Sequence, residues 1–375
     1  MKLFDVYPLY DVEIVKGCGS RVWDADDNEY LDLYGGHAVI SIGHAHPRYV
    51  SAISEQVARL GFYSNSVINS VQSRYAEKVG EISGLTDYTF FMCNSGAEAN
   101  ENAVKLASFI TGKSRVISFG KSFHGRTSLA VAITDNPKIV APVNDTHHRT
   151  IVALNDIEAV KRELAAGDVC AVIIEGIQGV GGMGMASDEF MKTLAVECKN
   201  AGAKLILDEV QSGCGRTGRY FAFQHYDIMP DIISVAKGIG NGFPMAGILI
   251  APDIEARYGM LGTTFGGNHL ACAAGSAVID VMMEEHLMEN AARVGAYAAE
   301  KLSGLPHVVA VKGRGLMLGV EFDEPIAAIR RALVFDKHIF TGAASNPCMI
   351  RILPPLCISE KDIDTLYDAL LDILK

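Results

Sequence analysis

The sequence predicts an α/β protein in which a large domain with a mainly parallel central sheet is joined to a smaller α/β domain. From about residue 88, short apolar segments alternate with helical stretches, a pattern typical of parallel strands covered by helices on both faces. After Thr264 the pattern changes to a long alanine-rich helix followed by further strands. The 375 residues are enough for two domains. We expect residues 1-45 to belong to the smaller domain, 46-262 to form the large domain and 263-375 to complete the smaller one.

Strands and helices alternate along the expected large domain. We expect strands at residues 88–93, 115–119, 169–175, 204–208 and 232–235, and helices at 97–110 and 187–201. Ligands of such sheets bind beyond the carboxyl ends of the strands, so residues at these ends can share one crevice. Four polar residues stand at these positions: Ser95, Glu175, Asp208 and Lys237.

The smaller domain is expected to combine both ends of the chain. An N-terminal hairpin is predicted at 20–24 and 30–33. The C-terminal part should hold a helix at about 269–285, strands at 308–311 and 315–322, and a last helix at 359–374 that opens with a Ser-x-x-Asp cap.

Composition excludes several classes of protein. Hydrophobic residues make up 49% and charged residues 21%, as in ordinary globular chains. The net charge of −11, without any Lys/Arg run, argues against nucleic acid or an anionic membrane as partner. The longest apolar stretches, such as residues 245–252, fall short of the roughly 20 residues that a membrane span needs. No signal-like segment opens the chain, and eight scattered cysteines without a C-x-x-C pair predict free thiols in the cytoplasm.

Lys237 and Asp208 carry the first chemical prediction. Lys237 has apolar neighbours and a following glycine, surroundings in which a lysine tends to become a neutral, nucleophilic amine. Asp208 ends an apolar strand, where a carboxylate needs a cationic partner. Pyridoxal 5'-phosphate (PLP) satisfies both residues, because its aldehyde condenses with a lysine and its protonated ring nitrogen needs a carboxylate.

Three further sites could bind charged or aromatic parts of ligands. Gly96 opens a helix after a strand, where free N–H groups can hold a phosphate, although Ser95 could equally be a simple helix cap. Phe123 could lie against a heteroaromatic ring, and Arg126 could bind a carboxylate, although a core Phe beside a surface Arg is the plainer interpretation. Arg351 stands among apolar residues, where an arginine usually meets an acid or an anionic ligand.

A rival signal points to a dinucleotide. Residues Gly179–Gly184 match G-x-G-x-x-G, and Asp208 follows at roughly the spacing of a ribose-binding acid. The first glycine, however, is separated from the strand, and the last precedes the helix, which argues against an NAD-dependent oxidoreductase. His44 and His46 lack a Cys or acidic partner at ligand spacing, so we expect structural histidines and no metal site.

In this order the motifs resemble the class III (ornithine-type) aminotransferases, which share the PLP fold type I of aspartate aminotransferase. The resemblance covers nearly the whole chain. It rests on Trp23-Asp24, Tyr30-Leu31-Asp32, Gly43-His44-Ala45-His46-Pro47, Ser95-Gly96-Ala97-Glu98-Ala99-Asn100, Phe123-His124-Gly125-Arg126, Leu207-Asp208-Glu209-Val210-Gln211, Lys237-Gly238 and Gly262-Thr263-Thr264-Phe265-Gly266-Gly267-Asn268. Chain length, Gly35-Gly36 and the ending Arg351-Ile352-Leu353-Pro354-Pro355 look most like the acetylornithine/succinylornithine branch of arginine metabolism.

The resemblance implies a role for each site residue. It makes residues 46-262 the PLP-binding domain, with Lys237 attached to the cofactor and acting as catalytic base, and Asp208 paired with the ring nitrogen. Other expected cofactor contacts are Ser95, Gly96, Ala97, Phe123, Glu209, Val210, Gln211 and, from the neighbouring subunit, Thr264. The expected substrate contacts are Arg126, Thr263 and Arg351, the last for the α-carboxylate of glutamate and 2-oxoglutarate.

The activity that the resemblance implies is transfer of the δ-amino group of an N2-acylornithine, acetyl or succinyl, to 2-oxoglutarate by a homodimer with shared sites. An ornithine δ-aminotransferase or a GABA-type ω-aminotransferase is the nearest alternative. The chain departs from the family at Val180, where a glutamate normally masks the conserved arginine. Gly176, His37 and His269 also replace the usual Pro, apolar residue and Pro.

Overall fold

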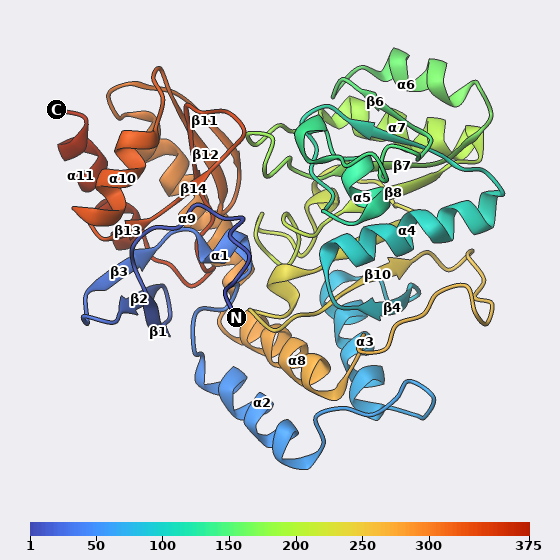
Figure 1. Cartoon of the computed structure of the whole chain (residues 1–375), viewed down its shortest axis with the longest axis horizontal. Helices are drawn as coiled ribbons and strands as arrows, with labels where there is room; N and C mark the ends of the chain where they lie inside the picture. The colour runs from blue at the N-terminus through green and yellow to red at the C-terminus, as the bar shows by residue number, and fades with distance from the viewer.

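A seven-stranded sheet forms the centre of the larger part of the molecule (Figure 1). The computed structural model describes all 375 residues. The strand order is β4-β10-β9-β8-β7-β5-β6, and five adjacent strands, from β9 to β6, are parallel. β10 runs antiparallel to both of its neighbours. The strands are β4 (Thr89–Cys93), β5 (Arg115–Phe119), β6 (Arg149–Val152), β7 (Val169–Glu175), β8 (Lys204–Asp208), β9 (Ile232–Val235) and β10 (Ala246–Ile250). The predicted mainly parallel sheet is confirmed.

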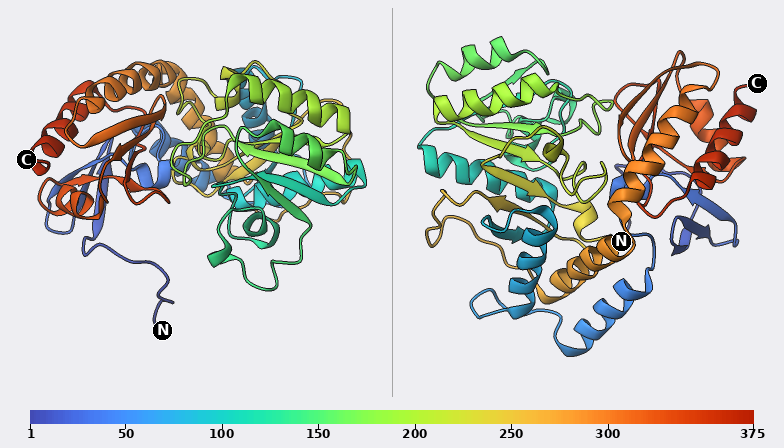
Figure 2. Two further views of the ribbon diagram at one scale, coloured as in Figure 1. Left: turned by 90° about the horizontal axis from the view of Figure 1, so that it is seen from above. Right: turned by 180° about the vertical axis from the view of Figure 1, so that it is seen from behind.

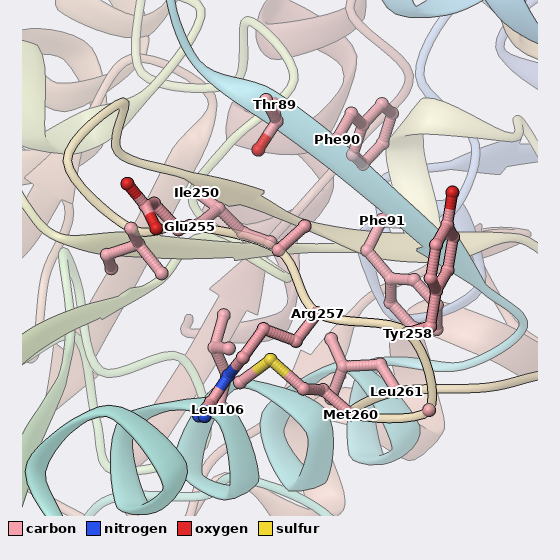
Figure 3. Close-up of a pocket in the computed structure, with 13 residues that line it drawn as sticks. Thr89, Phe90, Phe91, Leu106, Ile250, Glu255, Arg257, Tyr258, Met260 and Leu261 are labelled. Atoms are coloured by element: carbon pink, nitrogen blue, oxygen red, sulfur yellow. The ribbon is translucent and has the colours of Figure 1, made fainter.

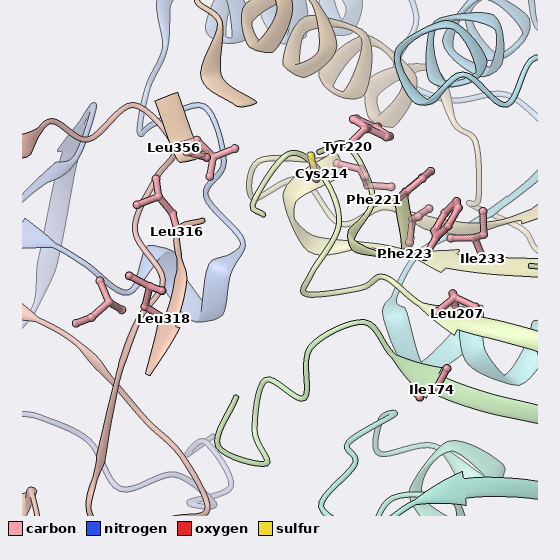
Figure 4. Packing of buried hydrophobic residues seen from close by; sticks show 14 of the residues in the cluster. Ile174, Leu207, Cys214, Tyr220, Phe221, Phe223, Ile233, Leu316, Leu318 and Leu356 are labelled. Atoms are coloured by element: carbon pink, nitrogen blue, oxygen red, sulfur yellow. The ribbon is translucent and has the colours of Figure 1, made fainter. Parts of the chain in front are cut away.

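Both faces of this sheet are buried, which explains its continuous apolar strands. On β7, Ala171 and Ile173 belong to one apolar cluster with helix α4, whereas Val172 and Ile174 belong to another with α7. The second cluster continues into the smaller part of the molecule. Figure 4 shows side chains of the large sheet, such as Leu207, in the same core as Leu316 and Leu318 of the smaller part.

Two four-stranded sheets build the smaller part. One has the order β1-β2-β3-β13 and the other β11-β12-β15-β14. Their strands are β1 (Ile14–Cys18), β2 (Arg21–Asp24), β3 (Glu29–Asp32), β11 (Val308–Arg314), β12 (Met317–Phe322), β13 (Ile339–Phe340), β14 (Gly342–Ala343) and β15 (Met349–Ile352). The parallel pair of β3 with β13 joins the predicted N-terminal hairpin to the C-terminal region.

The helices follow the expected alternation and add several that the sequence did not predict. They are α2 (Pro47–Arg59), α3 (Ser70–Ser83), α4 (Gly96–Thr111), α5 (Ser128–Ala132), α6 (Ile157–Leu164), α7 (Asp188–Ala201), α8 (His269–Glu284), α9 (Leu287–Ser303), α10 (Ala327–Phe335) and α11 (Glu360–Ile373). α8 packs against α2 and α3 on one side and α9 on the other, so it spans the two parts of the molecule (Figure 1). Ser359 and Asp362 form the expected capping box of α11.

Two local features of the N-terminal region are unusual. The short turn labelled α1 (Gly35–Ala38) is left-handed, with φ between 54° and 68° at all four residues. The residues before β1 project from the body of the molecule (Figure 2), and their apolar side chains, including Phe4 and Leu9, are exposed. No helix of the structure combines the length and apolar character needed to cross a membrane.

Candidate active site

The carboxyl ends of four strands meet around one cavity of about 250 Å³. Gly96 follows β4, Glu175 and Asp208 end β7 and β8, and Lys237 lies just beyond β9. Phe123, Arg126, Val180 and Gln211 line the same cavity. The crevice expected from the topology therefore exists, and most of the predicted site residues lie in it.

Asp208 is held by a network of neutral and imidazole donors. Its Oδ2 atom accepts a hydrogen bond of 2.8 Å from Asn100 Nδ2 and lies 2.7 Å from His124 Nδ1. The backbone N–H of Val210 donates to Oδ1 at 3.1 Å. Asn100 is fixed in turn by the Ser234 hydroxyl, which donates to its Oδ1 at 2.5 Å. The carboxylate is thus oriented from three elements, although it is almost completely buried.

Lys237 stands opposite this carboxylate in a strained backbone conformation. Its φ of 50° lies in the left-handed region, which an L-residue adopts only when the surroundings enforce it. Burial lowers the pKa of the Lys237 amine, against the opposing effect of Asp208 and Glu175. The following turn is held by Ser41, whose hydroxyl donates to the Gly238 carbonyl at 2.7 Å. A lowered pKa and a fixed position are what a nucleophilic amine requires.

Glu175 holds two loops of the cavity in place, the one that contains Phe123 and the one that begins near Gly179. Its two carboxylate oxygens accept hydrogen bonds from the backbone N–H groups of Phe123, at 2.9 Å, and Gly179, at 3.0 Å. Burial raises the pKa of this carboxyl to about 7. The loop from Gln178 to Gly184 closes on itself through a backbone bridge, and α7 starts only at Asp188. The glycine-rich segment is therefore a wall of this cavity and does not form the strand-turn-helix unit of a dinucleotide site.

Arg351, on β15, reaches the same wall from the smaller part. Its Nε donates to the Ala343 carbonyl at 2.5 Å, and Nη1 donates to the Gly179 carbonyl at 3.1 Å and to Gln211 Oε1 at 3.4 Å. All three acceptors are neutral, and only 4% of the residue is exposed. Burial lowers the pKa of the Arg351 guanidinium. This side chain is a desolvated cation without a carboxylate partner.

Some predicted residues lie outside the cavity in a single chain. Ser95 caps α4 by accepting a hydrogen bond of 3.2 Å from the Glu98 N–H, the simple role considered above. The carboxylate of Glu209 accepts hydrogen bonds from Ser212 and from the backbone of Ala222 and Phe223, so it is turned into the protein. Thr263 accepts a hydrogen bond from Asn94 at 3.2 Å, beside the start of α4. Thr264 is exposed at the surface.

The two histidines that were expected to be structural, His44 and His46, each contact an acidic side chain. His44 Nε2 lies 2.8 Å from Asp32, and His46 Nε2 lies 2.9 Å from Glu285. His46 also caps α2, because its Nδ1 accepts from the Arg48 N–H.

Two residues of the network, Asn100 and His124, were not among the predicted site residues. A signal for each existed in the sequence. Asn100 stands four positions after Gly96, hence on the same helix face, and His124 directly follows Phe123. Their contacts with Asp208 span 108 and 84 positions along the chain, so the pairing itself depended on the tertiary fold.

The residues of the cavity fit PLP. A Cβ atom on Gly96 would approach Val210 Cγ1 to 2.7 Å, so only glycine lets the N-terminus of α4 close on this site, where its N–H groups can bind a phosphate. Phe123 offers an aromatic face, and Asp208 offers a buried, oriented carboxylate for a protonated ring nitrogen. Lys237 offers an amine of lowered pKa for the aldehyde.

Fold and site together define a PLP-dependent aminotransferase. The chain belongs to the aminotransferase class-III family, whose model matches residues 6–374. The acetylornithine aminotransferase of Bacillus subtilis (strain 168) is 40% identical over 96% of this chain and 94% of that protein. The acetylornithine aminotransferase of Methanopyrus kandleri is also 40% identical, over 99% of this chain and 96% of that protein.

Solved structures give the same family. The ornithine aminotransferase of Toxoplasma gondii ME49 superposes with a TM-score of 0.91 at 29% identity, covering 98% of this chain and 91% of that one. The acetylornithine aminotransferase of Elizabethkingia anophelis superposes with a TM-score of 0.84 at 27% identity, covering 98% and 94%. The predicted class III aminotransferase, its α/β fold and its cofactor are therefore confirmed.

Proposed function

We propose that this enzyme transfers the δ-amino group of an N2-acylornithine to 2-oxoglutarate, giving an N-acylglutamate semialdehyde and glutamate, as a cytoplasmic reaction of arginine metabolism. The observation that carries the proposal is Arg351, a buried cation whose hydrogen-bond acceptors are all neutral. Val180 lines the cavity where an acidic residue could mask this charge. Relatives that are 40% identical over nearly their whole length and are named acetylornithine aminotransferases support the same substrate class.

Electrostatics explains why the acyl group matters. Free ornithine brings two ammonium groups, and the one beside its α-carboxylate would stand near an unmasked guanidinium. Like charges juxtaposed in a desolvated site cost several kcal/mol. Acylation turns the α-amine into a neutral amide and leaves only the reacting δ-amine charged. The substrate then presents a carboxylate to an arginine without adding a second cation.

Each residue of the cavity has a proposed task. PLP supplies an aldehyde that exchanges amino groups and a protonated ring that withdraws electrons from the reacting carbon. Lys237 Nζ would remove the proton from the substrate carbon that bears the reacting nitrogen and deliver it to the aldehyde-derived carbon of the cofactor, aided by the lowered pKa of its amine. Asp208 keeps the ring nitrogen protonated, and His124 and Asn100 hold its carboxylate. Arg126, which lines the cavity, and Arg351, which hydrogen-bonds the cavity residue Gln211, bind substrate carboxylates.

We further propose a homodimer in which each subunit completes the other's site. Thr264 lies outside the cavity and at the surface of the single chain. It is next to Phe265, whose ring lies 5.4 Å from that of Phe62. Both rings are exposed in the single chain. An apolar pocket of about 330 Å³ opens nearby, between edge strand β4, Leu106 of α4 and the segment around Tyr258 (Figure 3). An exposed apolar surface beside an edge strand is typical of a protein interface, and in the proposed dimer a second copy of the chain buries it.

Subunit complementation tests this assembly. Lys237→Ala chains and Thr264→Arg chains are each expected to lose activity as homodimers. A mixed dimer should contain one undamaged site and recover up to about half of the wild-type activity per hybrid. Hybrids verified by mass that stay inactive would contradict the shared site.

A substrate panel tests the reaction. The purified enzyme with 2-oxoglutarate should turn over N-acetylornithine or N-succinylornithine with a kcat/KM at least about 100-fold above that of ornithine, from the repulsion given above. A preference for free ornithine would favour the ornithine δ-aminotransferase alternative, which the Toxoplasma gondii structure also represents. A preference for 4-aminobutyrate would favour the GABA-type alternative.

A further inference from the structure

The turn that carries Lys237 is strained at both of its ends. Lys237 has a φ of 50° and Asn241 a φ of 46°, left-handed values that L-residues adopt only where their surroundings enforce them. Within the turn, the Gly240 N–H donates to the Lys237 carbonyl at 3.0 Å. The Asn241 N–H donates to the Gly238 carbonyl at 3.4 Å. These bonds connect the turn to itself, so contacts with another segment are needed to fix it relative to the cavity.

Asn241 ties the turn to residues 41–43, which lie 198 to 200 positions earlier in the chain. Its Oδ1 accepts hydrogen bonds from the backbone N–H groups of Ser41, at 2.8 Å, and Ile42, at 3.1 Å. Its Nδ2 donates to the Gly43 carbonyl at 3.0 Å. Asn241 is only 5% exposed, so these bonds are shielded from water. One amide side chain therefore satisfies backbone groups of three consecutive residues, which would be costly to bury without partners.

Two hydroxyl groups hold further carbonyls of the same turn. Ser41 Oγ donates to the Gly238 carbonyl at 2.7 Å, and Tyr49 Oη donates to the Gly240 carbonyl at 2.8 Å. Ser41 is 1% exposed, and its own carbonyl accepts from the Leu356 N–H at 2.7 Å, which anchors it to the smaller part of the molecule. The backbone on the C-terminal side of the lysine is thus fixed by side chains of the N-terminal region.

We propose that Asn241 and Ser41 are positioning residues for Lys237, and that they keep its amine directed at the cofactor by enforcing the left-handed backbone. The inference rests on the proposed role of Lys237 as the lysine attached to PLP. Released from these contacts, Lys237 returns toward the ordinary helical φ of about −63°, which is roughly 110° from its present 50°, and its side chain leaves its place opposite Asp208. A misplacement of about 1 Å at a reacting group can slow a reaction about 100-fold, so side chains outside the cavity can set its rate.

Two forms of the cofactor separate positioning of the lysine from general damage to the cavity. PLP joins Lys237 covalently, because the amine adds to the aldehyde and water leaves, whereas pyridoxamine 5'-phosphate has no aldehyde and binds without the lysine. The full-length enzyme, freed of cofactor, is mixed with each compound. Covalent capture is followed by borohydride quenching and peptide mapping, and the affinity for pyridoxamine 5'-phosphate by calorimetry.

Asn241→Gly removes the side chain at a backbone position that glycine adopts readily. Capture of PLP at Lys237 should become about 10- to 100-fold slower in this variant. Its affinity for pyridoxamine 5'-phosphate should stay within about twofold of the wild type, because the phosphate and ring contacts are unchanged. Ser41→Ala, which removes a single hydrogen bond, should slow capture about fivefold and leave the same affinity unchanged.

Matched variants control for loss of stability. Gln224 also joins distant backbone groups, because its Nε2 donates to the Ser83 carbonyl at 2.8 Å and its Oε1 accepts from the Phe221 N–H at 3.0 Å. The Ser83 hydroxyl donates to the Val79 carbonyl at 2.6 Å, and the residue is 3% exposed. Gln224→Ala and Ser83→Ala should lower the urea midpoint as much as the two positioning variants do, and still capture PLP at the wild-type rate.

Three results would overturn the inference. One is capture at the wild-type rate in both Asn241→Gly and Ser41→Ala, and another is capture that is slowed equally in the two control variants. The third is a loss of affinity for pyridoxamine 5'-phosphate in parallel with the loss of capture, since these residues would then shape the cavity as a whole. Failure of the proposed role of Lys237 is seen separately, as a pyridoxyl group on another lysine in the wild type.

Discussion

The two ends of the active site differ in how their charges are balanced. At the cofactor end, Asp208 is held by His124 and Asn100, and Lys237 faces it across the cavity. At the substrate end, Arg351 donates only to neutral oxygens. The cofactor end is built from strand ends of one sheet, whereas the substrate end combines a loop of the large part with β14 and β15 of the smaller one.

This difference separates chemistry from specificity. A network that orients one carboxylate from several elements preserves the same reaction whichever amino donor binds. An unpaired cation, in contrast, selects its ligand by charge, because only an anion relieves its desolvation. We therefore expect substitutions at the first end to change the rate with every substrate, and substitutions at the second to change the ratio between substrates.

The largest effect is expected for Lys237→Ala, which removes the proton-carrying amine. Turnover should fall below detection with all donors, while the phosphate-binding residues at α4 remain. Borohydride reduction and peptide mapping of the wild type should place one pyridoxyl group per chain on Lys237. Lys138→Ala, an exposed lysine outside the cavity, should keep wild-type activity and labelling. A pyridoxyl group on another lysine would contradict the assignment.

A smaller loss of kcat, again the same with every substrate, is expected for Asp208→Asn. Removing one partner of a buried charge pair typically costs about 3–5 kcal/mol, which corresponds to roughly a 10²- to 10⁴-fold lower kcat. The loss should be the same for N-acetylornithine and N-succinylornithine. Asp253→Asn, which changes an exposed carboxylate paired with Lys204 outside the cavity, serves as the control. A substrate-dependent loss would show that the two ends are not separate.

The cofactor end should also respond to pH through Glu209. Burial raises the pKa of its carboxyl to about 7 from an ordinary 4.5, despite three hydrogen bonds. The native state therefore binds a proton that the unfolded chain releases, and this contribution to stability is lost as the pH rises from about 4.5 to about 7. The free energy of unfolding should fall over this range by up to about 3 kcal/mol more in the wild type than in Glu209→Gln. Parallel denaturation profiles of the two proteins would contradict the raised pKa.

Much of this fold could be predicted because its buried strands are short apolar runs between turns. Strands β5, β7, β8 and β9 were predicted with the observed limits. β10 was noticed only as an apolar stretch, because a strand buried on both faces shows no alternation that would reveal it. β6, an edge strand of only four residues, two polar and two apolar, was not predicted.

The substrate end was harder to predict than the cofactor end. Lys237 and Asp208 could be predicted because a lysine and an acid rarely stand among apolar residues in a sequence. Arg351 could be predicted for the same reason, but the neutral character of its acceptors could not. Two of these acceptors, on Gly179 and Gln211, lie 172 and 140 positions away along the chain, so the contacts depended on the tertiary fold. The division of the chain into domains at residues 45 and 262 stays a prediction.

The central claim, that an unmasked cation sets specificity, is tested most directly at Val180. We would measure kcat/KM for N-acetylornithine and for ornithine in the wild type, in Val180→Glu, and in Val180→Gln as a control of equal size without the charge. The wild type should favour N-acetylornithine by at least about 100-fold, and Val180→Glu should narrow this ratio about tenfold by pairing with Arg351, whereas Val180→Gln should not. A wild type that prefers ornithine, or a ratio that is the same in all three proteins, would contradict the account.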